Sequence, residues 1–124
     1  MKLKISRDYA LLLNREYLPN IVRFSQARET VYPVDSDEHW NARIITGVCQ
    51  TLAYKFQLKI IVTEKPTILF NFTDAEVYTL YKFLLHFPIP EFKDWECMMR
   101  DLLIAKLHQY ILTPTPFLTY KLLN

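Results

Sequence analysis

Glycine is the scarcest informative residue in this sequence of 124 residues, which contains Gly47 and no other. Glycine supplies the positive φ angles of tight hairpins and the close backbone approach of phosphate-binding loops. A Walker loop, a dinucleotide-binding fingerprint, a nucleophile elbow and a kinase glycine-rich loop each require two or more glycines. The single glycine therefore excludes all four motifs.

Cysteines are also few, and long apolar runs are missing. Cys49 and Cys97 are the only thiols in a chain that is 51% hydrophobic, so no disulfide framework is needed, and we expect two free thiols in a reducing, cytoplasmic setting. No apolar run approaches the ~18 residues that span a bilayer, and no small-residue cleavage site follows the first apolar stretch. We expect one soluble domain, residues 1–124, that keeps its N-terminus and has no membrane partner.

Metal-binding chemistry has one weak candidate segment, residues 35–39, in which three acidic residues stand beside His39. Acidic residues are favoured at this position by the dipole of the helix that we predict to start here. No second segment has matching ligand spacing. We therefore predict neither a metal nor a cofactor.

Catalytic candidates are equally sparse. Cys97, Asp101 and His108 are the first residues to consider for a convergent site, but Cys97 and His108 are separated by about 16 Å along one predicted helix. The serines lie in no recognisable nucleophile context. We predict no catalytic residue, and an enzyme is the third of our functional hypotheses.

The first half of the chain has the pattern strand, helix, helix, strand. Apolar residues alternate with lysines at residues 2–5, which indicates a short strand with one buried face. Ser6 is a suitable N-cap for a helix that we expect to end before Pro19. A second helix of some twenty residues is expected to end near Phe56. The run LKIIV, residues 58–62, then predicts a strand.

The next segment predicts a hairpin followed by a capped helix. The run TILFNF, residues 67–72, is expected to pair with residues 58–62 across the turn TEKP. Thr73 and Glu76 form a capping box, in which each side chain satisfies the backbone N–H of the other residue. The switch from strand to helix is therefore placed at Thr73.

The second half repeats the order of the first. The capped helix is expected to end near Phe87, another helix to span about 91–112, and the alternation at 117–122 to form a last strand. We predict an α+β fold in which two βααβ halves, about 1–63 and 66–124, form a small, largely antiparallel four-stranded sheet packed against four helices. Four helices plus a hairpin without internal symmetry is the alternative.

The two halves differ most in the long connection 19–36. Connections of this length are usually functional or carry structure of their own, and we expect a small extra hairpin around SQARE. The first 28 residues carry six basic and two acidic side chains, a net charge of +4 against −2 for the rest. A basic segment attracts an anionic partner. We therefore predict a binding arm whose candidate residues are Arg23, Phe24, Arg28 and Tyr32.

Two further pairs of residues are candidate contacts. Tyrosine is enriched at protein interfaces, which favours Tyr78 and Tyr81, although both would also suit a helix packed between a sheet and its neighbour. On helix 91–112, Ile104 and Ile111 project roughly opposite to the broader apolar face. Either the connection 19–36 or the same helix of a second copy must cover them, which makes a homodimer a further hypothesis.

Our leading functional hypothesis is a small cytoplasmic binding protein that acts through protein–protein interaction, as an adaptor, inhibitor, immunity-type protein or subunit of an assembly. Its support is the lack of catalytic and cofactor motifs together with abundant helical apolar surface. The alternative is a nucleic-acid-binding regulatory protein that uses the basic N-terminal segment and the connection 19–36. Steep weakening of binding with salt would separate the two.

Overall fold

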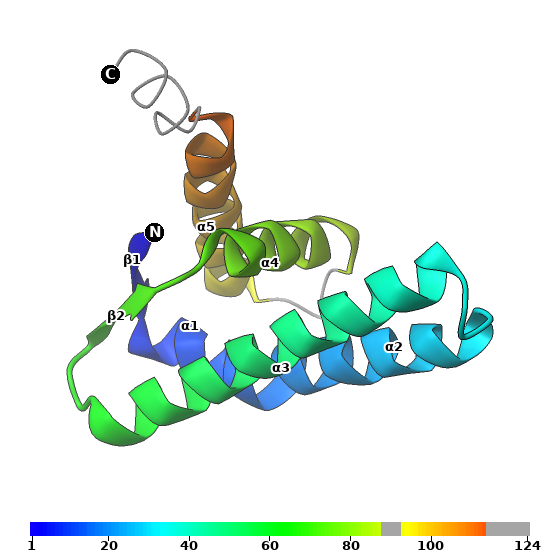
Figure 1. Cartoon of the computed structure of the whole chain (residues 1–124). Coiled ribbons are helices and arrows are strands. Elements are labelled where there is room, and N and C mark those ends of the chain that lie inside the picture. The colour runs from blue at the N-terminus through cyan, green and yellow to red at the C-terminus, as the bar shows by residue number, and fades with distance from the viewer. Residues whose placement is uncertain (88–92, 114–124) are drawn as a thin grey trace, which may run out of the picture.

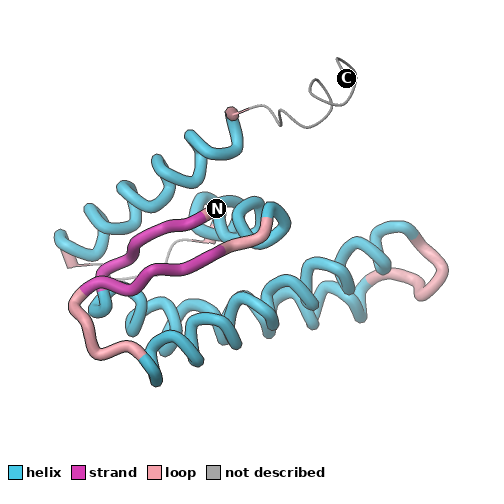
Figure 2. The backbone as a smooth tube through the Cα atoms, turned by 60° about the vertical axis from the view of Figure 1, so that its left-hand side comes forward, coloured by secondary structure: helices cyan, strands magenta, loops and turns pink. Residues whose placement is uncertain are grey.

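The computed structural model describes residues 1–87 and 93–113, and helices make up 77% of them. In chain order the elements are β1 (Lys2–Ser6), α1 (Arg7–Leu12), the π-helix η1 (Leu13–Tyr17), α2 (Leu18–Val31), α3 (Asp37–Val62), β2 (Thr67–Asn71), α4 (Asp74–His86) and α5 (Asp94–Leu112). Helices α2 and α3 lie side by side along the length of the molecule, and α4 lies between this pair and α5 (Figures 1 and 2).

The sheet in the described part of the chain has two antiparallel strands, β1 and β2, so the predicted four-stranded sheet is wrong. In the register, Leu3 stands opposite Phe70 and Ile5 opposite Ile68, and all four side chains are buried. The strands that pair are more than 60 positions apart in sequence, so the predicted hairpin is also wrong. The last strand predicted at 117–122 lies outside the described residues.

The segment predicted as the strand 58–62 forms the last turns of α3, which has 26 residues. A short apolar run does not by itself distinguish a buried helix from a strand. Here half-buried Ile60 continues the core stripe one turn beyond Phe56. In addition, the guanidinium of Arg7 donates to the carbonyl oxygens of Ile60, at 3.1 Å, and Thr63. These bonds satisfy carbonyls that the helix end leaves without partners.

Most of the segment predicted as the connection 19–36 is helix α2, so the hairpin expected around SQARE is wrong. The π-helix η1 joins α1 to α2, and Pro19 therefore falls in the first turn of α2. Proline is tolerated there because the i→i−4 hydrogen-bond pattern is already interrupted at this junction, where the backbone N–H of Leu18 donates to the carbonyl oxygen of Leu13. Residues 32–36 are all that joins α2 to α3.

Both predicted strand-to-helix junctions are confirmed. The Oγ atom of Ser6 accepts a hydrogen bond from the backbone N–H of Tyr9 at 3.3 Å, at the start of α1. Thr73 and Glu76 make both bonds of the predicted capping box at the start of α4. The chain is thus α+β, with the order strand, helices, strand, helices, in which the two strands lie side by side.

The core gathers aromatic and aliphatic side chains from both strands and all the helices. The ring of Phe70 lies 4.3 Å from that of Phe56 and 5.4 Å from that of Phe72, measured between centroids. The hydroxyls of Tyr9 and Tyr17 are buried without a hydrogen-bond partner, and burial raises the pKa of both phenols.

Within the described ranges, none of the helices combines the length and the apolar character that a membrane span requires.

Candidate functional site

A groove of about 460 Å³ lies where α2, α3 and α4 meet. We call it the aromatic groove. Its lining residues come from α2, α3, α4 and the residue after α4: Phe24, Arg28, Ile45, Tyr78, Thr79, Lys82, Phe83, His86 and Phe87. The groove combines three residues that the sequence indicated as candidate contacts, Phe24, Arg28 and Tyr78, with several that it did not.

Three phenylalanine rings form the apolar part of the groove. The ring centroid of Phe24 lies 4.3 Å from that of Phe87 and 6.3 Å from that of Phe83, the latter in an edge-to-face arrangement. Phe83 is buried, whereas Phe24 and Phe87 keep 37% and 38% of their surface exposed. The cluster therefore offers aromatic surface that a partner could cover.

Basic side chains border this aromatic surface. Arg28, Lys82 and His86 line the groove, and none of the described lining residues is acidic. The guanidinium of Arg28 lies 6.0 Å from the ring centroid of Phe24 and 5.9 Å from that of Tyr32, and it donates to the Tyr32 hydroxyl at 3.4 Å. These contacts hold the positive charge of Arg28 beside the apolar floor of the groove, which the rings of Phe24 and Phe87 form.

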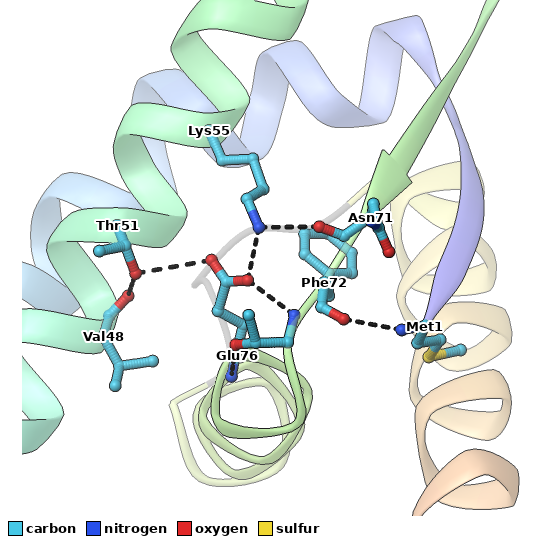
Figure 3. A network of polar contacts seen from close by, with 8 residues as sticks. Met1, Val48, Thr51, Lys55, Asn71, Phe72 and Glu76 are labelled. Carbon is cyan, nitrogen blue, oxygen red and sulfur yellow. Dashed lines mark hydrogen bonds and ion pairs between the residues drawn. The ribbon is translucent and has the colours of Figure 1, made fainter.

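A buried carboxylate fixes α4, which forms one wall of the groove, onto α3 (Figure 3). Glu76 is 3% exposed. Its Oε1 atom accepts from the backbone N–H of Thr73 at 2.8 Å and from the ammonium of Lys55 at 2.6 Å. Lys55 also donates to the carbonyl oxygen of Asn71 at 2.7 Å. Thr51 Oγ1 donates to the carbonyl oxygen of Val48 at 2.8 Å and lies 3.5 Å from Glu76 Oε2. The capping box is therefore part of a network that ties α3, β2 and α4 together.

Sequence reasoning missed Lys82, His86 and Phe87 as groove residues. A signal was available, because Tyr78, Lys82 and His86 are spaced by four and share one face of α4. No signal identified the residues of α2 that lie against this face, because residues 19–36 were predicted to be a connection with a small extra hairpin.

The other predicted contact residues lie elsewhere. Arg23 is exposed on α2 but does not line the groove. Tyr81 stacks on His108, with ring centroids 5.6 Å apart. Ile104 lies with Tyr81 and His108 in a second groove, between α4 and α5.

The predicted stripe on α5 is covered within the chain. Ile104 and Ile111 are partly buried against the core, and the cover at Ile104 comes from α4 rather than from the connection 19–36. On α5 the large apolar side chains that stay exposed are Trp95, Met98, Leu102 and Leu112, at 41%, 58%, 51% and 67%, together with Tyr110 at 37%. Ile104 and Ile111 are thus half-buried within the chain, and their role as a contact with a second copy stays a prediction.

The residues considered for catalysis do not form one cluster. Asp101 and His108 line the second groove, whereas Cys97 is half-buried and not among its lining residues. Cys49 is fully buried, and burial raises the pKa of its thiol. Both cysteines are free.

Metal ligands are not grouped in the described ranges, where no three His, Cys, Asp or Glu side chains could hold a metal ion together. In the segment 35–39, the Nδ1 atom of His39 lies 2.8 Å from the carbonyl oxygen of Glu29. This contact ties the start of α3 to the end of α2.

Comparison of the chain with protein-family models, with curated proteins and with solved structures finds no match.

Proposed function

We propose that this chain is a small binding protein that acts through protein–protein interaction, as an adaptor, inhibitor, immunity-type protein or subunit of an assembly. The observation that carries the proposal is the aromatic groove, in which exposed phenylalanine and tyrosine surface is bordered by Arg28, Lys82 and His86, and in which none of the described lining residues is acidic. The proposal includes a reducing, cytoplasmic setting, which suits the two free thiols.

The chemistry of the groove defines the partner segment. Its floor, Phe24 and Phe87, favours an apolar or aromatic anchor, because such side chains contribute most of the binding energy at protein interfaces. Its rim, Arg28, Lys82 and His86, favours acidic residues on either side of that anchor. We therefore expect a partner with an exposed segment in which a large apolar residue is flanked by aspartate or glutamate.

Capture from the cells that naturally produce the protein tests this function, with a matched pair of variants. Tyr78→Ala/Lys82→Glu changes two exposed groove residues spaced by four. Lys106→Glu/Tyr110→Ala makes the same two changes at the same spacing on α5, outside the groove. This variant also removes the bond that the Tyr110 hydroxyl donates to Asp74 Oδ1 at 2.6 Å, so it is a stringent control.

The unmodified chain and the α5 variant should enrich the same protein, and the groove variant should lose it by at least about tenfold. Equal capture by all three chains would show that the groove is not the docking site. Recovery of nuclease-sensitive material, with binding that falls steeply as salt rises, would instead support the nucleic-acid alternative.

A further inference from the structure

The outward face of α3 carries a second apolar stripe, separate from the aromatic groove. Five of its side chains are between 45% and 73% exposed: Trp40, Ile44, Tyr54, Leu58 and Ile61. Gly47 and Thr51, also exposed, occupy the two intermediate positions. We call these seven positions the α3 seam.

The spacing of the seam is that of a coiled coil. Successive positions from Trp40 to Ile61 are four, three, four, three, four and three residues apart. An average period of 3.5 residues keeps a stripe facing a partner helix along its whole length, here about 32 Å. The core stripe of α3, which includes Cys49 and Phe56, lies on the opposite side of the helix. Apart from Thr51, whose Oγ1 atom lies 3.5 Å from Glu76 Oε2 of α4, the seam is therefore not needed to pack α3 onto its own chain.

Gly47 has no explanation within the chain. Glycine inside a helix is about 1 kcal/mol less favourable than alanine. The backbone at Gly47 is not in the left-handed region, and a Cβ atom added there would meet no atom within 4 Å. Neither backbone conformation nor packing inside the chain requires glycine, whereas close approach by another molecule would.

We propose that the α3 seam pairs with the α3 seam of a second copy, as an antiparallel helix pair with its two-fold axis at Thr51. Reversing the seam about Thr51 places Gly47 opposite Tyr54 of the partner subunit, twice by symmetry. The tyrosine ring then covers the place where Gly47 has no side chain. Ile44 falls opposite Leu58 of the partner subunit, and Trp40 opposite Ile61 of the partner subunit.

Gly47 favours the antiparallel arrangement. A parallel pair would set Gly47 against Gly47 of the partner subunit and leave a void at the centre of the seam. The antiparallel pair fills the same space with a tyrosine ring.

The exposed area is sufficient for a dimer. The five apolar side chains of the seam have a total surface of roughly 150–200 Å² each. At the exposed fractions given above, they present on the order of 500 Å² of accessible surface per copy. A symmetric pair therefore buries on the order of 1,000 Å², the lower bound expected of a specific interface. The aromatic groove remains open in this dimer because, on α3, its lining uses only Ile45, which is not a seam residue.

Disulfide trapping tests the two-fold axis. Thr51→Cys places two thiols at the axis, and oxidation should link two copies. Gly47→Cys places the two substituted positions about 12 Å apart along the axis of the antiparallel pair, beyond the Cα separation of a disulfide, and should stay unlinked like the unmodified chain. A Gly47→Cys dimer that forms as readily as that of Thr51→Cys would overturn the antiparallel arrangement.

Sedimentation of the full chain tests the dimer itself. We expect a dimer at tens of micromolar, and Ile44→Glu should raise its dissociation constant by at least about tenfold because the charge is buried at the seam. Val31→Glu, at a valine that is 74% exposed and lies on α2, is the matched control and should leave the dimer unchanged. Circular dichroism should show that both variants fold, since both positions are exposed in the single chain.

Three results would overturn the proposal. The unmodified chain could remain a monomer at about 100 μM. The dimer could survive Ile44→Glu. It could also dissociate only with Leu102→Glu, which would place the interface on the exposed stripe of α5. Because the capture experiment changes residues of the groove and the sedimentation experiment changes the seam, the failure of one proposal does not imply failure of the other.

Discussion

Removing the buried carboxylate of Glu76 should destabilise the chain more than removing any exposed helix cap. The Glu76→Ala substitution deletes a charge-assisted bond to Lys55 at 2.6 Å and a bond from the backbone N–H of Thr73 at 2.8 Å. It also leaves the Lys55 ammonium, in a side chain that is 29% exposed, with one remaining bond, to a carbonyl oxygen. The start of α4 loses one of its two capping-box bonds together with its ion pair to α3, whereas Thr73 Oγ1 still accepts from the backbone N–H of residue 76.

The expected magnitude follows from these contacts. A hydrogen bond to a charged group contributes about 1.5–3 kcal/mol, and a helix cap about 1 kcal/mol. Because Lys55 regains some water, we expect Glu76→Ala to lower the free energy of unfolding by about 3 kcal/mol. Glu76→Gln keeps an acceptor for Thr73 and should cost about 1–1.5 kcal/mol. Lys55→Met combined with Glu76→Gln should show a coupling energy of about 1–2 kcal/mol.

Urea denaturation followed by circular dichroism measures these differences. Glu96→Ala is the matched control, because Glu96 Oε2 accepts the same kind of cap bond, from the backbone N–H of Lys93 at 3.0 Å, at the exposed start of α5. It should cost about 0.5–1 kcal/mol. If Glu76→Ala costs no more than Glu96→Ala, then the network of Figure 3 does not stabilise the fold and the reasoning is refuted.

Three further predictions concern buried polar groups. Tyr9→Phe and Tyr17→Phe should each leave the free energy of unfolding unchanged or raise it by up to about 1 kcal/mol, because each removes a hydroxyl that has no partner; a loss above about 1 kcal/mol in urea denaturation would contradict this. Arg7→Ala should lower the free energy of unfolding by about 1–2 kcal/mol and speed hydrogen exchange in the last turn of α3, because Arg7 donates to carbonyl oxygens at that end of the helix. Unchanged exchange there would show that Arg7 does not stabilise the end of α3. In the folded chain at pH 8, Cys97 should react with a thiol reagent and Cys49 should not, because burial shields Cys49 and raises the pKa of its thiol. Both thiols should react after denaturation. Rapid labelling of Cys49 in the folded chain would disprove the burial argument.

Several elements could be predicted because their signals lie within a few residues. Ser6 caps a helix whose first free N–H groups are three residues away, and Thr73 and Glu76 form their box over the same distance. The strands of Leu3 and Phe70 are visible as alternation of apolar and polar residues. These features depend on local hydrogen bonds and on period alone.

The candidate site was only partly predictable. Phe24 and Arg28 were identified as part of an aromatic and basic segment, and Tyr78 was identified because tyrosine is enriched at protein interfaces. That they share one groove depends on α2 being a helix packed along α3, with α4 crossing the pair. The seam on α3 was hidden for a similar reason, because its full length appears only when residues 58–62 are helical.

The sequence alone determined where helices and strands begin at the two capped junctions, and that neither a glycine-rich phosphate loop nor a disulfide framework is present. The tertiary structure decided which strand pairs with which, that the chain remains helical through Pro19, and that α3 continues to Val62. The physical reason is that a short apolar run or a proline is compatible with more than one backbone conformation. Contacts with distant residues, such as the bonds from Arg7 to the end of α3, select one of them.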